Sequence, residues 1–303
     1  MKQHLITLYS RTPLHVGSGT SVDVVDLPIM RERITAFPVI PASSLKGVLL
    51  QHARETFENG KHARNSSKPD DARILFGDIE EILEGGEKKQ KSYAGCVQIM
   101  EGKILVFPVR SLAGCFAWLT CPMALERFNR DTGKEVPIPQ VDKDYVIPGS
   151  ELIIDNQVVL EEYALRVQPH SPGDVAKVAA ELKQYCSDPL WQSKLAGRLA
   201  VVHDENFQHF VTTCTEVVTR IKVDPATRTV DEGALFNQEN VPSEAMFYSV
   251  LTVLPPRHTR TPNGFDPNAK LAELLPLDKP VILQIGADET TGHGLCELKH
   301  IEL

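Results

Sequence analysis

Side chains that could carry out acid–base or phosphate chemistry gather in one stretch near the start of the chain. His15 lies in a glycine-rich turn, Asp23 and Asp26 follow three residues apart, and Arg31 and Arg33 come next. A histidine can exchange a proton near neutral pH, a carboxylate can act as a general base, and arginine pairs well with phosphate. The combination points to RNA as the partner.

Two of these residues also have a plainer interpretation. A histidine beside glycines is at least as often a loop anchor that is hydrogen-bonded to the backbone, and this alternative stays open for His15. Asp23 could equally be a solvated loop aspartate.

A strand and a helix must hold this stretch in place. The apolar run at residues 5–9 is typical of a strand, and residues 43–57 have the spacing of an amphipathic helix. The helix carries Lys46 in its first turn, where free backbone N–H groups favour anions, and Arg54 eight residues later. The excursion between them holds too many Ile, Val and Leu residues for a disordered segment. We therefore expect an ordered, functional loop.

The rest of the chain indicates an α+β fold. The expected helices are residues 121–134, ending near Gly133, and residues 173–200, broken at Asp188 and Pro189. The expected strands include two pairs, 95–100 with 104–109 and 151–154 with 157–160, and the single runs 211–223, 245–254, 281–285 and 295–301. A β-α-β-β-α-β order fits this pattern, as do several other α+β arrangements.

Two polar excursions interrupt these elements. Residues 60–91 form a charged linker, and residues 221–242 form an arm between two strand-like runs. The arm is either a hairpin that contacts a partner or a surface hairpin without contacts. We predict one domain over residues 1–303 with insertions at these two places.

Composition bounds the class of protein. With 303 residues, 42% hydrophobic and 24% charged, the chain can bury a sizeable core. No apolar run approaches the ~20 residues of a membrane helix, and the first residues lack a signal-peptide core, so we expect a cytoplasmic protein without a membrane partner. The six cysteines contain no C-x-x-C pair, which predicts reduced, mostly buried thiols.

The charge balance limits how RNA could be bound. A net charge of −8 and a pI near 5.7 argue against binding by bulk electrostatics. Residues 1–91 hold 13 basic and 12 acidic residues, against 19 and 28 in the remainder. A local groove is therefore required, with Arg31, Arg33, Lys46 and Arg54 as its candidates. For Arg54, a solvated helix face is an equally good interpretation.

Seven motifs, spread in order over the whole chain, resemble the RAMP superfamily of CRISPR-associated proteins, and within it the repeating backbone subunit of type III-B (Cmr) effector complexes. They are TPLHVGSG (12–19), VVDLPIMRE (24–32), FPVIPASSLKGVL (37–49), ILFGD (74–78), VVHDENFQHFV (201–211), EGALFNQENVPSE (232–244) and IGADETTGHG (285–294).

The resemblance implies a ferredoxin-like, modified RRM palm with a thumb-like β-hairpin. It implies a subunit that polymerises with further copies and other Cmr subunits along guide RNA and cleaves bound single-stranded target RNA at regular intervals. Asp26 matches the residue that cleaves. Its implied cofactor is a divalent metal ion, Mg²⁺ by preference, with Asp23 as a second ligand. Glu239 matches an acidic position that we expect to shape the thumb.

The resemblance also assigns a role to the C-terminal glycine-rich loop. It implies that Gly292, His293 and Gly294 lie beside the first loop and the RNA backbone. Two features depart from the pattern: Leu50 replaces a basic residue common in the family, and no RNP-type aromatic motif is present. The second departure fits a protein that holds RNA by its backbone and leaves sequence reading to base pairing.

Three functions remain open at this point. The chain could be an endoribonuclease subunit that uses Asp26 and His15, a non-catalytic scaffold on the guide RNA, or an endoribonuclease that processes guide RNA without metal through His15.

Overall fold

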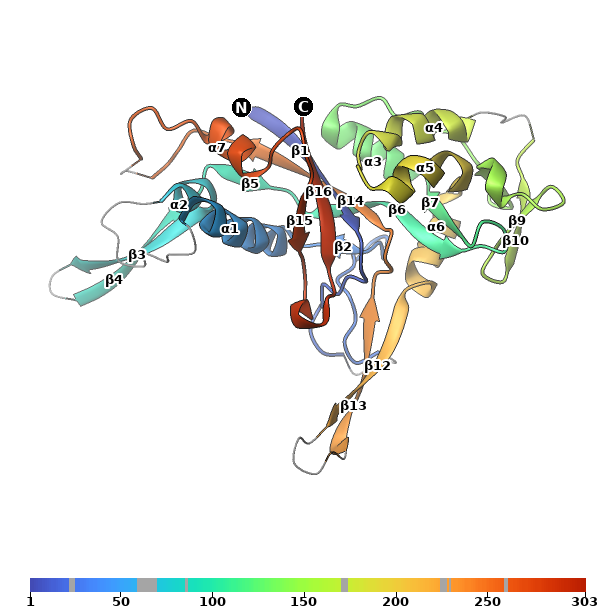
Figure 1. The fold of residues 1–303 in the computed structure, drawn as a ribbon, viewed down its shortest axis with the longest axis horizontal. Helices are drawn as coiled ribbons and strands as arrows, with labels where there is room; N and C mark the ends of the chain where they lie inside the picture. Colours follow the sequence, from blue (N-terminus) through green and yellow to red (C-terminus); the bar gives the residue numbers. More distant parts are fainter. Residues whose placement is uncertain are drawn as a thin grey trace.

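A long, mostly antiparallel sheet runs through the molecule (Figure 1). The structure is a computed structural model, which describes residues 1–21, 25–58, 70–84, 87–169, 174–223, 228, 230–258 and 261–303. Its strands are, in spatial order, β15 (Val281–Gln284), β16 (Leu295–Glu302), β1 (Lys2–Ser10), β14 (Met246–Val253), β6 (Gly102–Arg110), β7 (Phe116–Thr120), β11 (Leu199–Val202), β8 (Tyr145–Pro148), β10 (Tyr163–Val167) and β9 (Gln157–Leu160). Two short strands join at the side, β2 (Val39–Ile40) on β6 and β5 (Val97–Ile99) on β14.

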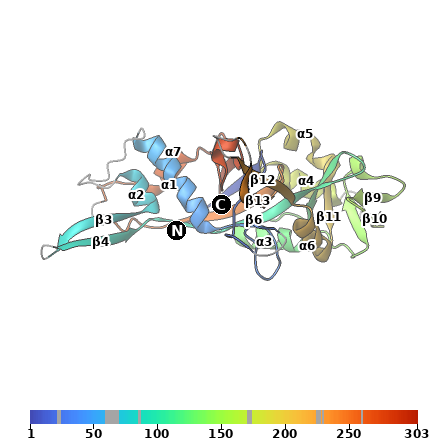
Figure 2. The same ribbon diagram turned by 90° about the horizontal axis from the view of Figure 1, so that it is seen from below.

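Helices cover the two halves of this sheet (Figures 1 and 2). They are α1 (Ala42–Glu58), α2 (Asp71–Phe76), α3 (Pro122–Thr132), α4 (Asp174–Lys183), α5 (Pro189–Arg198), α6 (Asp204–Thr213) and α7 (Pro267–Leu274), with 3-10 turns η1 (Ser150–Leu152) and η2 (Glu289–Thr291). Two apolar clusters make the core. One lies around α1, the first loop and α6, and the other surrounds Trp118 and Trp191 beneath α3, α4 and α5.

Two hairpins project from this body (Figure 1). One consists of β3 (Gly77–Glu84) and β4 (Glu87–Ala94), and the other of β12 (Glu216–Val223) and β13 (Val230–Asn240). The predicted linker 60–91 thus contains α2 and most of the first hairpin, with residues 59–69 and 85–86 outside the described residues. The predicted arm 221–242 belongs to the second hairpin, which begins earlier than expected, at Glu216.

Several local predictions are confirmed. Helix α1 buries Leu45, Leu49 and Ala53, as its apolar spacing requires. Helix α3 ends at Gly133, which has a left-handed conformation. The Asp188 side chain caps α5 at the predicted break by accepting the Leu190 N–H.

Three other local predictions are wrong. Strands β5 and β6 do not form a hairpin, because both pair with β14; Gly102 instead allows close packing on Ile40. Residues 150–152 form η1, in which Leu152 is buried, and not a strand. The run 211–223 begins inside α6, whose first turn carries acidic residues that suit a helix N-terminus.

The cysteine prediction is confirmed, because all six thiols are free and Cys96, Cys121, Cys186 and Cys296 are buried. Among the described residues, no helix has the length and apolar character needed to span a membrane.

Candidate functional site

Asp26 lies where the first loop crosses the root of the β12–β13 hairpin. Its Oδ2 accepts the backbone N–H of Asn237 at 2.7 Å. The neighbouring backbone continues the contact, with Leu27 N–H donating to Asn237 O at 3.0 Å and Glu239 N–H donating to Leu27 O at 3.0 Å. The carboxylate is half-buried, and its Oδ1 accepts no hydrogen bond from the described residues. One oxygen is therefore held in place while the other can reach a ligand.

The residues around Asp26 could hold a divalent ion through a single carboxylate. Asp23, the predicted second ligand, lies outside the described residues. Among the described residues no group of three or more His, Cys, Asp and Glu side chains could hold a metal. Mg²⁺ is commonly bound by one or two carboxylates, with water and substrate phosphate completing its shell. The Asp26 oxygen that accepts no hydrogen bond from the described residues fits that mode.

His15 is packed inside the same junction. Its side chain is buried, and its Nδ1 lies 2.6 Å from the backbone oxygen of Glu239. A carbonyl only accepts, so Nδ1 carries the proton. The other ring nitrogen faces Gly17, where an added Cβ would lie 2.7 Å from Nε2. This is the loop-anchor arrangement, and the catalytic role of His15 stays a prediction.

Glu239 and Arg31 form an ion pair that joins the hairpin root to the first loop. Arg31 Nη2 lies 2.5 Å from Glu239 Oε1, which also accepts the Thr215 hydroxyl at 2.8 Å, and Glu239 Oε2 accepts the Ile29 N–H at 3.0 Å. Arg31 Nη1 donates to the carbonyls of Ala36 and Val211, both at 2.9 Å. Glu239 thus shapes the root of the hairpin as expected. The guanidinium of Arg31 is engaged by protein acceptors, and its contact with RNA stays a prediction.

The other basic residues predicted to contact RNA are less engaged by protein partners than Arg31. Arg33 and Lys46 are exposed, Arg54 is half-buried, and no described residue forms an ion pair with any of them. Lys46 lies near Gly77 at the start of β3. No hydrogen bond between described residues links Lys46 or Arg54 to the Asp26 junction. The structure thus separates a first-loop group from an α1 group.

The C-terminal glycine-rich loop packs against the first loop, as the resemblance implied. Gly294 N–H donates to Pro13 O at 2.8 Å and Ala287 N–H to His15 O at 2.9 Å. Gly294 has a φ of +72°, and an added Cβ would lie 1.9 Å from Ile285 O, so only glycine fits. An added Cβ on Gly292 meets nothing within 4 Å, and half-buried His293 contacts Thr291.

Sequence reasoning missed the polar side chains that join this loop to the hairpin. Asp288 Oδ2 accepts Gln238 Nε2 at 2.5 Å from β13 and lies 3.0 Å from Arg220 Nη2 of β12. The only signal in the sequence was an aspartate within a glycine-rich loop, which does not identify its partners.

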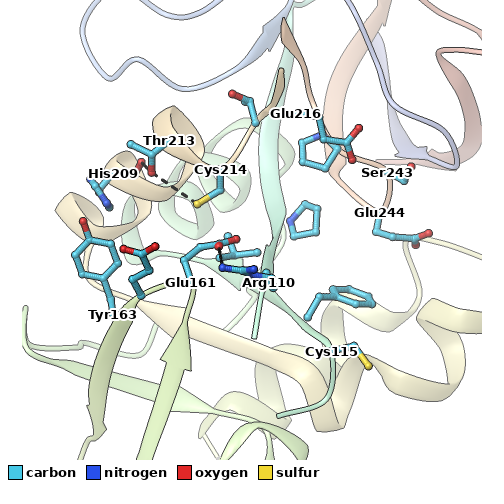
Figure 3. A pocket seen from close by; sticks show the side chains of 16 residues that line it. Arg110, Cys115, Glu161, Tyr163, His209, Thr213, Cys214, Glu216, Ser243 and Glu244 are labelled. Carbon is cyan, nitrogen blue, oxygen red and sulfur yellow. Dashed lines mark hydrogen bonds and ion pairs between the residues drawn. The ribbon is translucent and has the colours of Figure 1, made fainter. Parts of the chain in front are cut away.

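An acidic hollow lies on the other side of the hairpin root, between α6 and the β9–β10 turn (Figure 3). Its carboxylates are Glu161, Glu162, Glu216 and Glu244, while Arg110, the basic residue in its lining, is paired with Glu161 at 2.8 Å. Burial raises the pKa of Glu216, and it raises that of Glu244 to about 7. Because its lining is mainly acidic, this hollow disfavours phosphate.

Comparison with known proteins shows the family of the chain. The model of the RAMP superfamily matches residues 7–297. The CRISPR system Cmr endoribonuclease Cmr4 of Pyrococcus furiosus is 36% identical, over 98% of this chain and 95% of that protein. The chain belongs to the RAMP superfamily, in its Cmr4 family. The CRISPR system CMR subunit Cmr4 of Saccharolobus solfataricus is 25% identical, over 95% of this chain and 93% of its own.

Solved structures of this family have the same fold. The crystal structure of oligomeric Cmr4 from Pyrococcus furiosus superposes with a TM-score of 0.71 at 30% identity, covering 100% of this chain and 99% of that one. A type III-B Cmr-beta complex bound to cognate target RNA contains a chain with a TM-score of 0.68 at 17% identity, which covers 98% of this chain and 96% of its own. The second likeness concerns the fold alone.

Proposed function

We propose that this chain is a repeating, RNA-cleaving subunit of a Cmr complex. It polymerises along a guide RNA with further copies and other Cmr subunits, and it cuts bound target RNA at regular intervals. The observation that carries the proposal is the carboxylate of Asp26, which Asn237 N–H holds at the hairpin root and whose other oxygen accepts no hydrogen bond from the described residues. The 36% identical relative named an endoribonuclease supports it. The expected compartment is the cytoplasm.

A ferredoxin-like, modified RRM palm underlies this function. The chain order β1–α1–β6–β14–α7–β16 follows the β-α-β-β-α-β pattern of that fold. In space β1 lies between β16 and β14, and β14 lies between β1 and β6. Sheets of this kind hold single-stranded RNA on one face and its flanking loops.

The β12–β13 hairpin serves as the thumb. It carries large apolar side chains in water, with Val217, Ile221 and Leu235 exposed by 52%, 53% and 65%. Exposed apolar surface of this kind marks an interaction site. In the assembly the hairpin lies against the neighbouring copy or unstacked bases and displaces a target nucleotide at fixed intervals, so that the adjacent phosphate can reach in-line geometry.

Cleavage by the ribose 2′-hydroxyl requires that the chain position the RNA and supply one proton acceptor. Oδ1 of Asp26 accepts the proton of the ribose 2′-hydroxyl as the hydroxyl oxygen attacks the adjacent phosphorus. The bond between phosphorus and the 5′-oxygen breaks, and the leaving 5′-oxygen takes a proton from water. Asn237 N–H keeps the other oxygen in place during this step. If the same oxygen instead ligates a divalent ion, Asp26 and Asp23 would hold that ion, and it would stabilise charge on the phosphate.

Replacing Asp26 tests the proposal. Asp26→Asn has the same size and keeps an acceptor for Asn237 N–H, so stability and guide affinity should stay within about 0.5 kcal/mol of wild type. Cleavage of target RNA by the assembled complex should fall by roughly 100-fold or more. A target with a 2′-deoxy sugar at the scissile position should resist cutting.

Unchanged cleavage by the Asp26→Asn complex would support the scaffold function instead. A cut at the deoxy position would mean that water, and not the ribose hydroxyl, is the nucleophile.

A further inference from the structure

Three consecutive residues of β13 contact the two loops beside the hairpin root. Asn237 N–H holds the carboxylate of Asp26, Gln238 reaches Asp288, and Glu239 pairs with Arg31. Side chains of successive strand residues point to opposite faces. Glu239 therefore holds the hairpin from one face and Gln238 from the other.

Asp288 also contacts the second strand of the hairpin. Its Oδ2 lies 3.0 Å from Arg220 Nη2, and Arg220 pairs with Phe236 in the β12–β13 register. One carboxylate thus binds β12 and β13 together. Hydrogen bonds that involve a charged group are short and directional, so this contact restrains the angle at which the hairpin leaves the body.

Backbone contacts hold Asp288 in a fixed position. Asp288 has a left-handed conformation with a φ of +64°, and its carbonyl accepts the N–H groups of Thr291 and His293. The preceding residue, Ala287, donates to His15 O. An added Cβ on Gly286 would lie 2.2 Å from the same oxygen, so the two loops are in direct backbone contact. Asp288 is therefore fixed relative to the loop that carries Asp26.

We propose that Asp288 and Arg220 are positioning residues, which set the angle of the β12–β13 hairpin and thereby the phosphate that faces Asp26. The inference rests on the proposed function, because a hairpin angle matters for cutting only if the hairpin displaces target nucleotides. Without these Asp288 contacts, which we call the brace, Glu239 and the backbone bonds of Leu27 still hold the hairpin to the first loop, but they hold it on one face. The hairpin then pivots and moves Asn237, the donor that orients Asp26. Shifts of about 1 Å can lower a rate by roughly 100-fold.

Two variants and a matched control separate this role from a general effect of charge. Asp288→Asn keeps a residue that tolerates the left-handed conformation but removes the charge, and Arg220→Gln removes the partner. Glu289→Gln removes a charge from the next position, which is exposed. Arg220→Lys keeps the charge and should rescue function in part.

The readouts are the lengths of target fragments cut by complexes with equal subunit content, and amide hydrogen exchange of the isolated chain. We expect Asp288→Asn and Arg220→Gln to broaden the cut positions and slow cleavage by roughly 10- to 100-fold, with the double variant no worse than either single one. Exchange at the amides of residues 219–221 and 235–239 should speed up by about tenfold. Glu289→Gln should match wild type in both.

Unchanged exchange in the brace variants overturns the inference whatever the activity. Faster exchange with wild-type cut positions also overturns it, as does an equal effect of Glu289→Gln. Failure of wild-type complexes to cut at regular intervals counts against the proposed function, and the exchange experiment still tests the brace.

Discussion

The two arginines of the first loop should contribute differently to stability and to RNA binding, because their partners differ. Arg31 is bound to Glu239 and two carbonyls, whereas exposed Arg33 has no ion pair with a described residue. Arg31→Ala should lower the free energy of unfolding by about 3 kcal/mol, because it leaves a buried carboxylate unpaired. Arg33→Ala should stay within about 0.5 kcal/mol but weaken RNA binding and reduce its salt dependence. Urea unfolding measures the change in stability, and RNA titration at two salt concentrations measures the change in binding and in its salt dependence. Equal stability losses would contradict the prediction.

Glu244 should make stability depend on pH. Burial raises its pKa from 4.5 to about 7, and its carboxylate accepts the Tyr9 hydroxyl. The folded state therefore binds the proton more tightly than the unfolded chain. The contribution of this group to stability is greatest below pH 4.5 and falls as the pH rises through 7. Glu244→Gln should match wild type at pH 5 and melt higher at pH 8 in thermal unfolding. Glu162→Gln, an exposed residue of the same hollow, is the control and should leave the slope unchanged.

The hairpin can be tested as an element by shortening its outer part. A deletion of residues 224–240 would abolish regular cuts but would also remove Asn237, Gln238 and Glu239, which hold Asp26 and the first loop. Replacing residues 222–234 by a two-residue Asn-Gly turn keeps the root, where Ile221 pairs with Leu235. Guide binding should persist, while regularly spaced target fragments should disappear. Regular fragments from the shortened hairpin, resolved on a sequencing gel, would show that it is not the thumb.

Charge limits the behaviour of the whole molecule. With a net charge of −8, a single copy should bind short RNA weakly, and its few phosphate contacts should give binding a shallow dependence on salt. Many linked contacts along one guide strengthen binding without a strong single site. Electron microscopy of the chain with guide RNAs of increasing length should show stacks that grow by one copy per fixed number of nucleotides. One copy per guide at every length would contradict repeated binding.

The sequence by itself determined several local elements and the family. Helix α1, the left-handed Gly133 and the Asp188 cap follow from side-chain spacing and backbone conformation within a few residues. The motifs likewise indicated the superfamily and the position of Asp26. Only the tertiary structure decided how His15 and Arg31 are used, because their partners lie 224 and 208 residues away along the chain. Asp288 shows the same limit: an aspartate in a loop becomes a brace only when the sheet brings β12, β13 and that loop together.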